Sequence, residues 1–162
     1  MKRSLFAAFL FLISSIATAQ PWPNQSIRLV VPFAPGGGVD TMARILAQPL
    51  AQRLGQSIAV DNRGGAGGLI GTDLVAKAPG DGHTLLLTST ALVVNPSMYA
   101  RLPYDTLSDL VPITLVSVSP FALVTPADSP YKTVKDVLAA LRGSSALSFG
   151  VSDSSAMLSG QL

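Results

Sequence analysis

The sequence contains no cysteine, no glutamate and only one histidine among its 162 residues. Without cysteine, the chain can form no disulfide bond, use no thiolate nucleophile and carry no lipid on an N-terminal cysteine. The lone His83 cannot belong to a histidine cluster, so we expect neither a zinc site nor a non-haem iron site. We therefore expect a protein stabilised by its apolar core, with no metal and no cofactor.

Positive charge is scarce as well. Of the 11 Lys and Arg residues, two are Lys2 and Arg3, so that nine basic residues balance nine aspartates from Gln20 onward. A nucleic-acid-binding protein needs a basic patch, which this balance does not supply. We therefore expect no nucleic acid partner.

No apolar run is long enough to cross a membrane comfortably. The longest, residues 5–16, falls short of the ~20 apolar residues that a membrane-spanning helix needs. It follows two basic residues and precedes Ala-Thr-Ala at 17–19, which is the pattern typical of a secretory signal peptide. We predict that residues 1–19 are a signal peptide, cleaved after Ala19, and that the protein is exported.

The next part of the chain alternates strand and helix patterns. Short β-branched or apolar runs are each followed by a glycine-rich turn or by a segment with apolar residues at helical spacing. We predict strands at 27–31, 57–60 and 84–87, and helices at 40–54 and 69–78, with Asp40 as the N-cap of the first helix. This order predicts an α/β fold with a parallel sheet flanked by helices.

The pattern is less regular after residue 90. Asn-Pro at 95–96 and the segment 102–105 are typical of loops, and 105–110 predicts one helical turn. Further expected elements are strands at 113–118, 121–125 and 146–150, and a helix that Thr133 caps and Gly143 ends. Because prolines bracket a change of composition, we place a domain crossing near 120–130, with one lobe at 20–122 and the start of a second at 123–162.

Three predicted strand ends are rich in Gly, Ser or Thr, namely 33–40, 88–90 and 150–155. Ligands of open α/β sheets gather at the carboxyl ends of strands, where helix N-termini present unpaired N–H groups. Such groups bind an anion without Lys or Arg, so a small carboxylate suits a chain with little positive charge.

Each of these features also has a simpler structural explanation. Glycines at 36–38 permit a tight turn whatever the function, and the same holds for 64–68. Asp40 suits a helix cap, and Arg63 suits a solvated loop, although it is the best basic candidate for binding a carboxylate. The first glycine turn matches neither a phosphate-binding loop nor a dinucleotide-binding motif.

The serines near the C-terminus, Ser152, Ser154 and Ser155, are nucleophiles only if a base lies beside them. One histidine and no G-x-S-x-G motif make a serine hydrolase improbable, so we expect no catalytic residues. An exported enzyme that uses the same cleft remains an alternative hypothesis.

Three motifs resemble those of one family. Residues 26–40 (SIRLVVPFAPGGGVD), 54–68 (LGQSIAVDNRGGAGG) and 81–86 (DGHTLL) are similar to the solute-binding proteins of tripartite tricarboxylate transporters, also called Bug proteins. The resemblance implies a type II periplasmic-binding-protein-like fold, in which two lobes close on a small carboxylate in the periplasm. It implies a monomer that delivers its ligand to membrane transporter subunits.

The resemblance also implies the ligand contacts. Carried over onto this sequence, they are Phe33, Ala34, Pro35, Gly36, Gly37, Gly38, Asp40, Thr88, Ser89, Thr90, Ser152, Ser154 and Ser155. Family members are longer than this chain, so we expect a truncated product with an incomplete second lobe. A fragment with no function of its own is therefore a further alternative.

Overall fold

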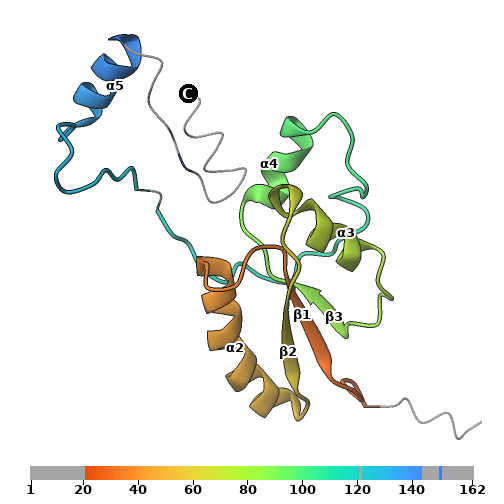
Figure 1. Cartoon of the computed structure of the whole chain (residues 1–162). Helices are drawn as coiled ribbons and strands as arrows, with labels where there is room; N and C mark the ends of the chain where they lie inside the picture. The colour runs from red at the N-terminus through yellow and green to blue at the C-terminus, as the bar shows by residue number, and fades with distance from the viewer. Residues whose placement is uncertain (1–20, 121, 144–149, 151–162) are drawn as a thin grey trace, which may run out of the picture.

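A computed structural model describes residues 21–120, 122–143 and 150. Its elements, in chain order, are β1 (Ile27–Val31), α2 (Gly38–Leu54), β2 (Ile58–Asn62), the short 3-10 helix η1 (Ala66–Gly68), α3 (Leu69–Ala76), β3 (Thr84–Leu86), α4 (Ala91–Met98) and α5 (Val134–Gly143). Figure 1 shows a sheet with helices packed against it, and α5 standing apart from the sheet.

The strands form one parallel sheet in the order β2-β1-β3. β1 lies in the middle, with Arg28 opposite Ala59 of β2 and Thr84 of β3. α2 packs on β1 and β2, whereas α3 packs on β1 and β3. The α/β fold and the parallel pairing predicted from the sequence are therefore confirmed.

The core is centred on β1. Ile27, Val30 and Val31 are completely buried, and Leu29 and Val31 pack with Ala43 of α2. A central parallel strand is covered on both faces, which explains why β1 reads as an almost continuous apolar run. Burial of these side chains supplies the main stabilisation in a chain without disulfide bonds.

α2 begins earlier than the sequence predicted. Its N-cap is Gly37, with no side-chain cap bond, and Asp40 lies in the first turn, so the prediction of Asp40 as N-cap is wrong. Pro49 lies inside the helix as expected. Gly55 ends it in the left-handed conformation, with φ of 70° and its N–H bonded to the carbonyl oxygen of Ala51 at 2.9 Å.

Several element boundaries also differ. β2 continues to Asn62 because its register with β1 extends that far, and the predicted loop at 95–96 lies inside α4. The predicted strands at 113–118 and 122–125 have no regular structure, and residue 121 lies outside the described part. An apolar β-branched run forms a strand only where another strand pairs with it, and none pairs with these segments among the described residues.

The helix expected after Thr133 is present as α5. The hydroxyl of Thr133 accepts the N–H of Asp136 at 3.2 Å, and the carboxylate of Asp136 accepts the N–H of Thr133 at 2.8 Å. This reciprocal pair is a capping box, so the predicted cap is confirmed. Most of the predicted strand at 146–150 lies outside the described residues, and the boundary between the lobes stays a prediction.

Candidate functional site

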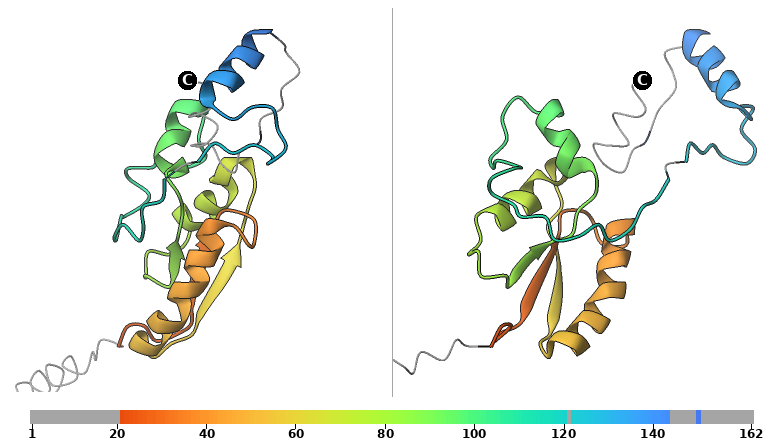
Figure 2. Two further views of the ribbon diagram at one scale, coloured as in Figure 1. Left: turned by 90° about the vertical axis from the view of Figure 1, so that its left-hand side faces the viewer. Right: turned by 180° about the vertical axis from the view of Figure 1, so that it is seen from behind.

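The candidate site is the edge of the sheet where the parallel strands end. The turn at 32–37 leaves β1, the turn at 63–68 leaves the neighbouring β2, and the segment 87–90 leaves β3 on the other side. The N–H of Leu87 still pairs with the carbonyl of Val30 at 2.9 Å, so β1 and the segment after β3 run side by side up to this edge. Both views in Figure 2 place these loops together between the sheet and α4.

The turn after β1 exposes its backbone. Residues 34–38 are all exposed, and Gly36 has a φ of 84°, which favours glycine. Gly37 precedes α2 in an extended conformation and provides no side chain to cap it. The N–H groups of Gly38 and Val39, at the start of α2, therefore have no intrahelical partner and carry the positive end of the helix dipole. This geometry suits a small anion.

The carboxylate of Asp40 is the centre of a hydrogen-bond network, here called the brace, that stabilises that turn. Its side chain is buried, and its carboxylate accepts hydrogen bonds from Gly36 N at 2.8 Å, Arg44 Nε at 3.0 Å and Asn62 Nδ2 at 3.0 Å. Asn62 Nδ2 also donates to the carbonyl of Phe33 at 3.2 Å. The three hydrogen-bond donors to this carboxylate all belong to the protein, so Asp40 stabilises the turn from its buried side.

The same contacts set the charge of Asp40. The hydrogen bond from Arg44 and the N–H of Gly36 lower the pKa of Asp40 from its usual 3.8 to about 2. The carboxylate is therefore ionised at neutral pH. The N–H of Gly36 is already bonded to Asp40, so the amides that could receive an anion are those at the start of α2.

Arg44 and Asn62 were not among the residues predicted from the sequence. Arg44 follows Asp40 by four residues on a helix, a spacing that brings opposite charges together. The ion pair could therefore have been predicted from the sequence. Asn62 reaches the turn because it pairs with Val31 at the end of β1. Only the strand register reveals that position.

The segment after β3 has a different arrangement. The hydroxyl of Ser89 accepts the N–H of Ala91 at 3.2 Å, and the carbonyl of Ser89 accepts the N–H of Leu92 at 3.2 Å. The first amides of α4 are therefore bonded within the protein. Thr88 is half-buried and Thr90 is exposed, so the side chain of Thr90 is accessible at this edge of the sheet.

The second glycine turn is structural, in line with its simpler explanation. Gly65, Gly67 and Gly68 all have positive φ. A Cβ atom on Gly64 would lie 3.4 Å from the backbone carbon of Phe33, and one on Gly71 would lie 2.7 Å from the carbonyl oxygen of Arg63. The glycines let this turn approach the backbone that follows β1.

Arg63 and His83, the basic and imidazole side chains considered from the sequence, both contact other residues of the protein. Arg63 donates to the carboxylate of Asp61 at 3.0 Å, and Arg28 binds the same carboxylate, so Arg63 is a half-exposed member of an ion cluster. His83 is largely buried beside Trp22, with ring centroids 5.9 Å apart, at the opposite edge of the sheet. Neither side chain lies at the candidate site as a free group.

The remaining candidates have no structural description. Ser152, Ser154 and Ser155 lie outside the described residues. Within the described ranges, no three His, Cys, Asp or Glu side chains are grouped to hold a metal ion, and no helix is long and apolar enough to span a bilayer.

Comparison with known proteins identifies the family of this chain. The model of the "Tripartite tricarboxylate transporter family receptor" family matches residues 42–161. The chain is 46% identical over 144 residues to the UPF0065 protein in the tcbD-tcbE intergenic region of Pseudomonas sp. strain P51, with 87% of this chain and 43% of that protein covered. It is 48% identical over 115 residues to protein BugT of Bordetella pertussis, with 70% of this chain and 35% of that protein covered.

The chain is also similar to solved structures of periplasmic binding proteins. "R. palustris Rpa4515 with adipate" is 34% identical, with a TM-score of 0.71 over 76% of this chain and 42% of that one. The periplasmic binding protein BugD is 41% identical, with a TM-score of 0.53 over 54% of this chain and 29% of that one.

The chain thus spans less than half the length of these relatives. The family consists of receptors and not enzymes, so the expectation of a non-catalytic protein is confirmed and the alternative of an exported enzyme is wrong. The motifs, the parallel sheet with its exposed glycine turn, and these matches lead to one conclusion: the chain belongs to the tripartite tricarboxylate transporter receptor family.

Proposed function

We propose that this chain forms the N-terminal part of a periplasmic receptor that captures a small carboxylate and delivers it to a tripartite tricarboxylate-type membrane transporter. The observation that carries the proposal is the exposed start of α2, where Gly38 and Val39 present backbone N–H groups at the carboxyl edge of the sheet. Helix N-termini bind carboxylates through such groups. A relative of known structure is described with adipate, which makes adipate the first ligand to test.

The proposal includes export and a second wall of the site. Residues 1–19 act as the signal peptide, with cleavage after Ala19, because a basic start, an apolar run and a small-residue site follow one another. Ser152, Ser154 and Ser155 close the site from the second lobe. N-terminal sequencing of the exported protein should begin at Gln20.

A matched pair of substitutions at Gly38 tests the amide site. Proline is well tolerated at the first position of a helix, where it removes the N–H group and leaves the fold intact. A Cβ at Gly38 meets open space, so Gly38→Ala keeps the N–H and disturbs nothing. Isothermal titration calorimetry with adipate, succinate and citrate measures the affinity of each variant.

We expect Gly38→Pro to weaken carboxylate binding about 10-fold, since a hydrogen bond to a charged group is worth about 1.5 kcal/mol or more. Gly38→Ala should bind as the wild type does. Equal affinities for the proline and alanine variants, or no binding of any carboxylate by the wild type, would contradict the proposed function.

A further inference from the structure

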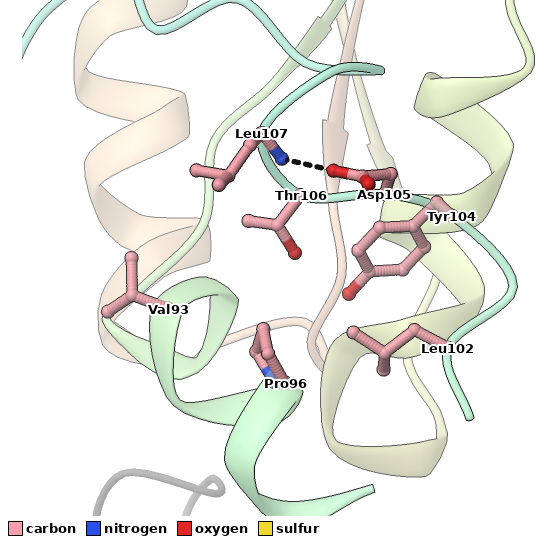
Figure 3. Close-up of a pocket in the computed structure, with 7 residues that line it drawn as sticks. All are labelled: Val93, Pro96, Leu102, Tyr104, Asp105, Thr106 and Leu107. Atoms are coloured by element: carbon pink, nitrogen blue, oxygen red, sulfur yellow. Dashed lines mark hydrogen bonds between the residues drawn. The ribbon is translucent and has the colours of Figure 1, made fainter. Parts of the chain in front are cut away.

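The buried side of α4 contains a polar side chain. Ala91 and Asn95, which lie one helical turn apart, are each 1% exposed. Val93 and Pro96, on another side of the helix, are exposed and line an open hollow (Figure 3). α4 packs on η1. Asn95 therefore lies between α4 and the second glycine turn.

The two polar atoms of the Asn95 side chain have different surroundings. Its Nδ2 donates a hydrogen bond to the carbonyl oxygen of Gly67, in the second glycine turn, at 3.2 Å. Its Oδ1 is buried with no partner among the described residues. A buried acceptor without a hydrogen bond destabilises the folded state relative to an apolar group of the same size. Asn95 is therefore not the best residue for stability at this position, and such exceptions are typical of functional sites.

The segment 88–90 is attached to the first turn of α4. The carbonyl oxygen of Ser89 accepts the N–H of Leu92 at 3.2 Å. The carbonyl oxygen of Thr90 accepts the N–H of Val94 at the same distance of 3.2 Å. A shift of α4 therefore moves this segment, and with it the exposed side chain of Thr90.

The second glycine turn lies directly against the turn after β1. A Cβ atom on Gly68 would lie 3.5 Å from the ring of Phe33, and one on Gly64 would lie 3.4 Å from the backbone carbon of the same residue. The hydrogen bond from Asn95 to Gly67 thus joins α4 to the loop that leads into α2.

We propose that Asn95 is a positioning residue of the carboxylate site. Its Nδ2 holds α4 against the second glycine turn, so that Thr90 lies at a fixed distance from the amides at the start of α2. This inference rests on the proposed function, and it assigns to Asn95 an effect on affinity that is separate from its effect on stability. The side chain of Asn95 is buried and does not touch the ligand itself.

Two substitutions by apolar residues of similar size separate positioning from stability. Asn95→Leu removes the hydrogen bond to Gly67 and also the unpartnered Oδ1, two changes that act on stability in opposite directions, so we expect an unchanged urea midpoint. Thr72→Val is the matched control, because Thr72 of α3 is 2% exposed and donates to the neighbouring carbonyl of Gly68 at 2.8 Å. This control should lower the urea midpoint while α4 stays in place.

Isothermal titration of the purified full chain with adipate measures the affinity of each variant. We expect Asn95→Leu to weaken binding about 5-fold and Thr72→Val to leave it unchanged. In the ligand-free chain, the amide NMR signals of residues 88–90 should shift in Asn95→Leu but not in Thr72→Val. Asn95→Ala, which adds no bulk, should weaken binding to the same extent and replaces the leucine variant if that variant does not fold.

The outcomes separate this inference from the proposed function. If the wild type binds adipate and Asn95→Leu binds it equally well, the inference is overturned and the proposed function stands. If both variants lose affinity in parallel with stability, Asn95 has only a structural role and the inference is again overturned. If the wild type binds no carboxylate, the proposed function fails and this inference fails with it.

Discussion

Two regions of this chain contain apolar runs, of which one is buried in a strand and the other is exposed. Residues 27–31 form the central strand, where Val30 and Val31 are completely buried. Residues 111–118 are also rich in Val, Ile and Leu, yet Val111 is 88% exposed and Val118 is 83% exposed, and the segment forms no strand. The difference lies in the partners, because β1 has a strand on both sides and the later run has none among the described residues.

The comparison shows what an apolar pattern does and does not predict. It predicts a tendency to extend and to be buried, but the burial itself depends on which segments lie beside it. The four experiments that follow, in order of decreasing effect, probe the two regions and the turn that joins the sheet to the site.

The largest effect is expected from a charge in the first region. Val31→Asp places an unpaired carboxylate in a fully buried position beside Ala43, so we expect the cooperative unfolding transition to disappear. Val118→Asp is the matched substitution in the exposed region and should leave the transition unchanged. Circular dichroism during thermal unfolding measures both. If Val31→Asp melts like the wild type, β1 is not the core.

A methyl group on Gly71 should have the next largest effect. It would lie 2.7 Å from the carbonyl of Arg63 and 2.8 Å from Pro32 Cα, both backbone atoms that cannot move easily. We expect Gly71→Ala to lower the free energy of unfolding by about 2 kcal/mol in urea titrations. Gly38→Ala adds the same group in open space and should not lower it. Equal stabilities for the two variants would rule out the close approach of α3 to the end of β1.

Acid should weaken the brace beneath the turn after β1. The folded pKa of Asp40, about 2, is below the usual 3.8, so its contribution to stability is complete above about pH 4 and is lost as the pH falls to 2. Asp40→Asn should therefore be less stable than the wild type at pH 7 but lose less stability between pH 4 and pH 2. Melting temperatures across this range measure the effect, and parallel curves for the two proteins would contradict it.

The smallest effect on stability is expected in the exposed region. Ile113 and Leu115 are 78% and 79% exposed, and uncovered apolar side chains favour self-association. The chain is therefore expected to associate, although a complete receptor of this family is expected to be monomeric. Ile113→Lys with Leu115→Lys should shift sedimentation profiles toward the monomer and change the free energy of unfolding by no more than about 0.5 kcal/mol. An unchanged sedimentation profile would indicate that this strip has no such role.

Much of the first region could be predicted from the sequence. The strand at 27–31 and the end of the first helix at Gly55 were placed correctly because apolar spacing, Pro32 and a left-handed glycine mark these limits locally. The parallel order followed from the alternation of strands and helices. These features depend on near neighbours in the chain, which a single sequence displays.

The features that were missed depend on distant neighbours. Asp40 was assigned to the helix cap, whereas the register that places Asn62 beside Val31 makes its carboxylate an internal brace. Residues 113–118 were assigned to a strand from their apolar pattern. The assignment failed because the sequence does not reveal whether a partner strand lies beside them. For Ser152, Ser154 and Ser155, the assignment to the ligand site stays a prediction.

The central claim is that backbone amides at the start of α2, and not arginine side chains, receive the carboxylate. A titration of the isotope-labelled chain with adipate, followed through its amide and arginine Nε NMR signals, tests this most directly. The account predicts that the amide signals of Gly38 and Val39 move the most, while those of Ala91 and Leu92, already bonded to Ser89, move little. Large shifts of the Nε signals of Arg63 or Arg28, with the Gly38 and Val39 amides unmoved, would contradict it.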